Sequence, residues 1–386
     1  MDFELNEEQR MFQRVVRDFC ENELKPHAHD IDENGQLHWP AIRKMRDLGL
    51  LSLQVPEDYG GAALDSVCAS IAVEELGRVC GSTALSISAH NGLGLGPIVR
   101  WGTPEQKDRF IPLLTDGEHL GALALTEPQA GSDLLNGAQA YAERDGDEWV
   151  VNGHKAWITN PKYAPVITVL LRTDRAAGSS GFSMMLVETD RDGLTIHPPE
   201  KKMGLKGSPT QMLTFDNVRV PASNVLGPEG MGFKQTMQTL DAGRVSIGAL
   251  SVGLAQGAFE EMVRYAKDRK AFGEPIANKQ AIQWMIADAA VEIEAARTLV
   301  HKAAVAKDKG GDFTKIAAIA KLKASEVAEK VCHDAIQIHG SYGYSREYPV
   351  ERMYRDQRLM TIGEGTSEIQ RLVIARRVLQ EFDEPR

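Results

Sequence analysis

The sequence predicts an α+β protein built of three consecutive parts. These are an N-terminal helical domain (1–119), a middle antiparallel β domain (120–228) and a C-terminal four-helix bundle (229–386). Helix-capping signals recur in the first part. In the second part, Xaa-Gly pairs separate segments in which apolar and polar residues alternate. In the last part, apolar residues recur every three or four positions over long stretches.

Two capping boxes mark helix starts in the N-terminal part. The segments Asn6–Gln9 and Thr103–Gln106 each place a side-chain acceptor three residues before a glutamine. We expect the first of these helices to run to about Leu24. A cluster of Pro, Gly and Tyr over residues 55–61 predicts a loop.

The middle part carries two strong turn signals. Asp145–Gly146 and Asn152–Gly153 are typical of two-residue hairpins, because both central positions need φ > 0. Further strands are expected at Val166–Arg172, Phe182–Glu188 and Met212–Val220.

The C-terminal part reads as helix over most of its length. Long helices are expected at Asp241–Ala271, Lys315–Ile338 and Glu368–Glu381, together with one amphipathic stretch. The apolar stripe of that stretch consists of Ile282, Met285, Ala289, Ile293, Ala296, Leu299 and Ala303. Four such helices predict a bundle.

Composition excludes several classes of function. The 386 residues include 44 Lys and Arg against 54 Asp and Glu, a net charge of −10, which argues against nucleic-acid or anionic-membrane partners. Residues 79–99 lack charged side chains, but their Gly, Ser, Thr, His and Asn are too polar for a membrane span. The acidic N-terminal stretch matches neither a signal nor a transit peptide. Four cysteines without a C-x-x-C motif predict a reducing, cytoplasmic compartment.

Familiar cofactor and metal motifs are missing from the sequence. Gly92–Gly96 resembles part of a dinucleotide fingerprint, but it follows no predicted strand and lacks the downstream acidic residue. We expect a close-packed loop or helix crossing there. The histidines at 27, 29, 333 and 339 join no recognisable ligand set, so no metal site is predicted.

Two stretches of the β domain are candidates for binding a flat, polar ligand. Leu123–Asp133 leaves an apolar run and ends in a loop rich in hydroxyls, glycine and backbone donors, which suits a heterocycle and a phosphate. A polar turn has the same composition, and the residues alone leave both interpretations open. Trp157–Thr159 can stack on a flat cofactor, although a Trp buried in a β core is the commoner case.

A third stretch, Gly363–Arg371, holds a candidate general base. Glu364 stands between two glycines, just before a helix at whose start Ser367 and Gln370 form a capping box. The carboxylate would serve as a base if burial raised its pKa against the helix dipole. The alternative is a solvated loop glutamate.

Together these stretches resemble the acyl-CoA dehydrogenase family, the FAD enzymes of fatty-acid and branched-chain β-oxidation. The likeness spans almost the entire chain and is closest to the short-chain (butyryl) branch. The shared motifs, in family order and at family spacing, are LALTEPQAGSD, NGHKAWITN, LDAGR, DRKAFG, QIHGSYGY, YRD and EGTSEIQR. The resemblance implies the family's three-part fold.

The resemblance also implies FAD as the cofactor and names its contacts. These are Leu123, Leu125, Thr126, Gly131, Ser132, Trp157, Ile158, Thr159, Arg269, Phe272, Gln280, Gln337, Ile338, His339, Gly340, Ser341, Thr366 and Glu368. Arg269, Gln280 and the segment 337–341 match positions that reach the FAD of a neighbouring subunit, which implies a homotetramer. Acyl-CoA contacts are implied for Ser132, Asp241, Arg244 and Gly365.

Glu364 matches the family's catalytic base. It would remove the α-proton of the thioester while the β-hydride passes to FAD, which gives a trans-2-enoyl-CoA. The electrons would then pass to an electron-transfer flavoprotein. Another branch of the family carries its base at the position of Gly243, so Glu364 is the candidate here.

Two further positions bear on the substrate. Ser82 aligns approximately with an Arg of the glutaryl enzymes, and Gly363 stands where short- and medium-chain members often have Tyr. A short-to-medium straight acyl chain is therefore expected. The alternatives are a branched short-chain acyl-CoA dehydrogenase, an oxidase or nitroalkane-type enzyme, and a non-catalytic flavin-binding protein. The DNA-associated kind of the last is disfavoured by the net charge.

Overall fold

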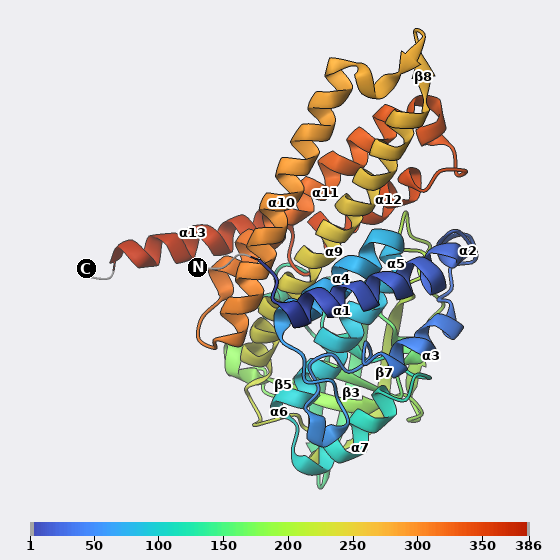
Figure 1. Ribbon diagram of the computed structural model, residues 1–386. Coiled ribbons are helices and arrows are strands. Elements are labelled where there is room, and N and C mark those ends of the chain that lie inside the picture. The colour runs from blue at the N-terminus through green and yellow to red at the C-terminus, as the bar shows by residue number, and fades with distance from the viewer. Residues whose placement is uncertain (1–3, 384–386) are drawn as a thin grey trace.

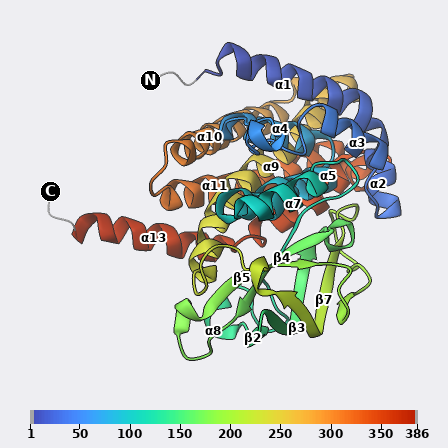
Figure 2. The same cartoon turned by 90° about the horizontal axis from the view of Figure 1, so that it is seen from below.

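The computed structural model describes residues 4–383 and shows two helical regions with a β-sheet packed beside them (Figures 1 and 2). The helices of the first region are α1 (Glu7–Phe19), α2 (Ala28–Asn34), α3 (Trp39–Asp47), α4 (Ser66–Val79), α5 (Gly81–Ser88), α6 (Gly96–Trp101) and α7 (Pro104–Leu114). Two of their starts follow directly from the sequence. In α1 and α7 the Asn6 and Thr103 side chains accept the N–H of the glutamine three residues later, and that glutamine side chain accepts the N–H of the capping residue in return.

The Gly92–Gly96 segment forms part of a π-helical turn (Ala89–Leu95) and the first residue of α6. A Cβ atom on Gly94 would lie 2.5 Å from the backbone of Gly121, just before the first strand of the sheet. Glycine is needed at this position because two backbones touch there. The prediction of a close-packed crossing is confirmed.

The middle region contains a seven-stranded sheet within residues 4–383. Its strands are β1 (Ala122–Ala124), β2 (Tyr141–Asp145), β3 (Glu148–Thr159), β4 (Val166–Arg172), β5 (Phe182–Glu188), β6 (Leu194–Ile196) and β7 (Thr210–Pro221). The order is β1-β4-β2-β3-β7-β6, with β5 paired to β4. Most neighbours are antiparallel as predicted, but β2 joins β4 in parallel at one residue pair, and β1 pairs with β4 in parallel along its length. A long connection makes this possible, because β2 and β3 lie between the two strands in the sequence.

One of the two predicted hairpin turns is wrong. Asp145 pairs with Glu148, so β2 and β3 do form a two-residue hairpin, but its loop is Gly146 and Asp147, one residue later than predicted. Asn152–Gly153, by contrast, lies inside the continuous strand β3, at a register shift against β7. A Cβ on Gly153 would lie 2.7 Å from Ala140, so this glycine permits a bulge in a crowded sheet and does not reverse the chain.

The C-terminal region consists mainly of helices, four of them long. They are α9 (Gly232–Asp268), α10 (Gln280–Asp308), α11 (Thr314–His339), α12 (Val350–Gln357) and α13 (Ser367–Asp383), and a short hairpin of β8 (Lys270–Ala271) and β9 (Glu274–Pro275) joins the first two. Helices α9, α10 and α11 run side by side, and α13 packs on α11 and extends away from the body (Figures 1 and 2). Within residues 4–383, no helix combines the length and the apolar character needed to cross a membrane.

The two helical regions share one apolar core, in which Val16 of α1 and Leu250 of α9 belong to the same cluster of buried side chains. A Cβ on Gly253 of α9 would lie 2.3 Å from the carbonyl oxygen of Glu74, so α4 and α9 are in backbone contact. The sheet has a separate cluster on each face. Along β4, Leu170 belongs to one cluster and Val169 to the other, as the alternation of a strand requires.

Candidate active site

Glu364 lies in the turn between a 3₁₀ segment (Arg358–Thr361) and α13, with φ at +52°. The residue as a whole is half-buried, but its Oε2 atom is fully buried and has no hydrogen-bond partner within residues 4–383. A Cβ atom on Gly243 would lie 1.9 Å from that oxygen. The carboxylate therefore rests against the backbone of α9. Left-handed backbone at a bulky residue and an orphaned buried oxygen are both typical of functional sites.

Two cations act on this carboxylate from different helices. Burial raises the pKa of Glu364 to about 7, and the opposing effects of Lys321 on α11 and Arg244 on α9 limit the rise. Arg244 donates to Asp241 at 2.5 Å, and Asp241 accepts a second bond from Thr314 at 2.7 Å. The alternative of a solvated loop glutamate is therefore wrong for this residue.

The start of α13 differs from the prediction. Thr366, not Ser367, caps the helix, since its Oγ1 accepts the N–H of Ile369 at 3.3 Å. The Ser367 hydroxyl is buried without a partner, and the Gln370 side chain donates to the Gly365 carbonyl at 2.9 Å. Hydroxyl residues stand at both 366 and 367, so the sequence alone allows either of them to cap the helix.

A buried ion pair lies beneath the β-domain loop. The Lys155 Nζ atom donates to Glu127 at 2.8 Å and to the Leu125 carbonyl at 3.1 Å, and neither charged side chain reaches solvent. The Glu127 carboxylate also accepts the N–H groups of Gln139 and Ala140. Sequence reasoning missed this pair. The available signal was the placement of a lysine in the buried alternation of β3.

The side chains above this pair present a mixed surface. Leu123 and Leu125 are just buried, Thr126 is half-buried, and Gly131 and Ser132 are exposed. The loop thus has buried apolar side chains at its base and exposed polar groups at its rim. A polar turn and a ligand-binding loop share these features, but the buried ion pair fixes the backbone in a way that a simple turn does not need.

Trp157 is exposed to 62% and adopts φ of +60°, at the second register shift between β3 and β7. The alternative of a Trp buried in the β core is therefore wrong. Ile158 is buried and Thr159 is half-buried, so the tryptophan alone turns outward. An outward indole held in a costly backbone conformation suits a surface that binds a flat ligand.

The remaining predicted cofactor residues lie elsewhere in the chain. Arg269, Phe272 and Gln280 belong to the β8–β9 hairpin and the start of α10, which Figure 1 shows at the end of the helices far from the sheet. Phe272 is 97% exposed with φ of +53°. Within one chain, these residues therefore lie far from the strand that carries Trp157. Such a separation is expected if they contact the FAD of a neighbouring subunit.

The segment 337–341 ends α11 and begins the next turn. Gln337, Gly340 and Ser341 are exposed, while Ile338 and His339 are buried. The His339 ring stacks on Tyr265 and is hydrogen-bonded to the Ala335 carbonyl, so it supports the segment from inside. Thr366 is half-buried, Gly365 lies beside the base and Glu368 is exposed.

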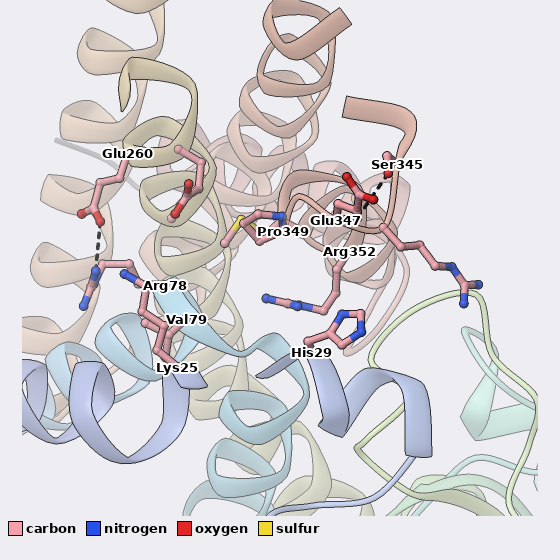
Figure 3. A pocket seen from close by; sticks show the side chains of 13 residues that line it. Lys25, His29, Arg78, Val79, Glu260, Ser345, Glu347, Pro349 and Arg352 are labelled. Atoms are coloured by element: carbon pink, nitrogen blue, oxygen red, sulfur yellow. Dashed lines mark hydrogen bonds and ion pairs between the residues drawn. The ribbon is translucent and has the colours of Figure 1, made fainter. Parts of the chain in front are cut away.

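A cavity of about 620 Å³ lies apart from this site, between the N-terminal helices, α9 and α12 (Figure 3). Its lining includes Arg78, Lys25 and Arg352 but none of the predicted site residues. The Arg78 guanidinium already forms ion pairs with Glu21, Glu75 and Glu260, so its charge is not left unpaired toward the cavity. Within residues 4–383, no group of three or more His, Cys, Asp or Glu side chains could hold a metal ion.

Comparison with known proteins identifies the family of this chain. Sequence profiles of the acyl-CoA dehydrogenase N-terminal, middle and C-terminal domains match residues 6–118, 122–218 and 230–379. A probable acyl-CoA dehydrogenase of Bacillus subtilis (strain 168) is 50% identical over 381 residues, which cover 98% of this chain and 100% of the relative.

Solved structures give the same result. Butyryl-CoA dehydrogenase from Megasphaera elsdenii has a TM-score of 0.95 at 41% identity, covering 98% of this chain and 100% of that one. An acyl-CoA dehydrogenase from Bacillus anthracis complexed with FAD has a TM-score of 0.91 at 35% identity, covering 98% and 68%. The fold and these matches define a flavoprotein oxidoreductase. The chain belongs to the acyl-CoA dehydrogenase family.

Proposed function

We propose that this chain catalyses the FAD-dependent α,β-dehydrogenation of short-to-medium-chain acyl-CoA to trans-2-enoyl-CoA, and passes the electrons to an electron-transfer flavoprotein. The observation that carries the proposal is the buried, unpartnered Oε2 of Glu364, held against Gly243. A carboxylate with a pKa near neutrality can accept a proton from a weak carbon acid more readily than an ordinary glutamate can.

The chain supplies the acid–base part of this reaction. Glu364 removes the α-proton of the thioester. Among the described residues, no backbone carbonyl accepts the N–H of Glu364, which leaves that N–H available to polarise the thioester carbonyl. The Lys321–Gly365 and Gln370–Gly365 hydrogen bonds hold this turn while the proton moves.

The residues present fit FAD. Trp157 offers an exposed indole, and the loop around Thr126 offers polar groups over a rigid base. The N-terminus of α13, beside Thr366 and Glu368, provides backbone donors of the kind that suit a pyrophosphate. When bound, FAD supplies the hydride acceptor.

Homotetramer formation is part of the proposal. Its support is the exposed apolar surface on elements that one chain leaves uncovered, such as Phe272 (97%), Trp284 (60%) and Phe382 (74%). A cytoplasmic location is also proposed, in line with four free, buried cysteines.

The substrate class rests on two small residues, Gly363 next to the base in the sequence and Ser82 in α5. A Cβ on Gly363 would be in ordinary contact with Leu359, at 3.5 Å, and the glycine itself places no side chain beside the base. Ser82 is buried and accepts the N–H of Gly207, so this position offers no cation to a dicarboxylyl substrate. A straight chain from butyryl upward fits these features.

The experiment is an anaerobic titration of the purified protein with acyl-CoAs from butyryl to dodecanoyl, followed in the flavin spectrum. Wild type should bleach with at least one of them. Glu364→Gln should retain FAD and lose nearly all bleaching, whereas Glu381→Gln, an exposed change on α13, should behave as wild type.

Full bleaching by Glu364→Gln would refute the assignment of the base. Flavin that no acyl-CoA bleaches in wild type would favour the non-catalytic flavin-binding alternative. Absence of flavin, even after reconstitution with FAD, would contradict the proposed reaction as a whole.

A further inference from the structure

Lys321 lies in the middle of α11, and its side chain is completely buried. Its Nζ atom donates to the carbonyl oxygen of Gly365 at 2.8 Å. Gly365 directly follows Glu364, and both residues have positive φ, at +94° and +52°. The lysine thus holds the left-handed turn that carries the proposed base, and it does so from a different helix.

The charges around the turn are few. Glu364 is acted on by Lys321 from α11 and by Arg244 from α9. Arg244 is committed to Asp241, which lies 2.5 Å away. Lys321 is influenced in turn by Glu364, Arg244, Glu368 of α13 and Glu326 of α11.

The other two carboxylates near Lys321 are occupied or solvated. Glu326 pairs with Arg371, and Glu368 is exposed. Among the described residues, no carboxylate forms an ion pair with Lys321 within 4.0 Å. Glu364 is therefore the carboxylate that acts most strongly on its charge, and burying a lysine without an ion-pair partner is costly.

We propose that Lys321 is a positioning residue for Glu364: it holds the Gly365 carbonyl, and its positive charge favours the ionised form of the buried carboxylate. The inference rests on the proposed role of Glu364 as the base and adds a second residue on which that role depends.

Protonation behaviour agrees with this geometry. Burial lowers the pKa of Lys321 to about 8 and raises that of Glu364 to about 7. Between these values both groups are charged, so the pair acts as an ammonium–carboxylate couple in a window close to neutral pH. Below that window Glu364 is protonated, and above it Lys321 loses its charge.

The kinetic test compares Lys321→Gln, which keeps a donor but removes the charge, with Lys321→Met, which removes both. Lys323→Gln is the matched control, because Lys323 is on the same helix but pairs with Glu292. Both Lys321 variants should raise the apparent pKa of kcat/KM by about one unit, which lowers the rate roughly fivefold at pH 7 and restores it above pH 9. The control should leave the pKa unchanged, and an unchanged pKa in both Lys321 variants would overturn the proposal.

A second test needs no activity. Melting temperatures of the FAD-loaded wild type, Lys321→Gln, Glu364→Gln and the double variant are compared at pH 7.5 and pH 5.0. At pH 7.5, the Lys321→Gln change should lower Tm more in the protein with Glu364 than in the protein with Gln at position 364. At pH 5.0, where Glu364 is protonated, this difference should vanish. Lys321→Met replaces the Gln variant if the latter does not fold.

The two tests separate the two claims. A Tm difference that appears only at pH 7.5 supports the link between Lys321 and Glu364 even in a protein that bleaches with no acyl-CoA, and then only the proposed reaction fails. Equal Tm losses in both backgrounds at pH 7.5 would overturn the link itself.

Discussion

The Oε2 atom of Glu364 occupies the place where a side chain at position 243 would begin, since a Cβ built on Gly243 would lie 1.9 Å from it. A glycine in the middle of a long helix costs about 1 kcal/mol relative to alanine. Here the missing Cβ lets a carboxylate approach the backbone of α9. The two positions are thus one structural unit, although they are far apart in the sequence.

Gly243→Ala should separate stability from activity. The added methyl group cannot coexist with the carboxylate, so we expect kcat/KM to fall by more than tenfold, while Tm stays equal or rises because alanine favours the helix. Gly248→Ala on the same helix meets a methyl group of Val300 at 3.0 Å and serves as the control. Steady-state kinetics and thermal unfolding of both variants check this; unchanged kcat/KM in Gly243→Ala would show that Glu364 does not work from this position.

The rate should depend on pH through Glu364. Its pKa is raised to about 7, and the base must be ionised, so kcat/KM should rise about tenfold per pH unit below 7 and level off above it. The measurement is kcat/KM with the best acyl-CoA between pH 5.5 and 9. A plateau that already extends down to pH 5.5 would contradict a raised pKa.

The stability of the folded protein should fall with rising pH, whereas kcat/KM rises. The folded-state pKa of Glu364 lies above the ordinary value of 4.5, so its contribution to stability is present below pH 4.5 and is lost as the pH rises through 7. Wild type should therefore lose about 2 to 3 kcal/mol from this group between pH 5 and pH 8. Glu364→Gln should not, and the Tm advantage of this variant should grow over the same interval. Parallel Tm curves would refute the assignment.

Trp157 should matter for cofactor retention more than for folding. Trp157→Gly relieves the positive φ and removes the indole, so we expect apoprotein stability to be equal or higher and FAD affinity to fall about five- to tenfold. Trp157→Phe keeps a ring and should lose less. The flavin-to-protein absorbance ratio after gel filtration measures retention. Equal ratios in all three proteins would mean that the indole does not cover the cofactor.

The Glu127–Lys155 pair should behave as one unit. Lys155→Met leaves a buried carboxylate without its cation and should cost about 3 to 5 kcal/mol, whereas Glu127→Leu combined with Lys155→Met should cost less than the sum of the single changes. Denaturant unfolding of the three variants tests this. Strict additivity would indicate that each residue stabilises the loop alone.

Local signals in the sequence were sufficient where the interaction itself is local. The capping boxes at Asn6 and Thr103 formed as predicted, because both partners lie within one turn. The close packing expected around Gly94 also follows from residue type. The same signals failed where a distant element decides. Asn152–Gly153 has the composition of a turn, but pairing with β7 holds it inside a strand as a bulge.

For the site, the sequence by itself determined the residue types. It pointed to Glu364 between glycines, to an aromatic and a hydroxyl on one strand, and, through the family motifs, to the reaction class. Only the tertiary structure decided that Trp157 points outward, that Thr366 caps α13, and that Lys155 and Lys321 are buried beneath the two loops of the site. The physical reason is that burial, and with it the pKa of an acid, depends on helices and strands that meet only when the chain has folded.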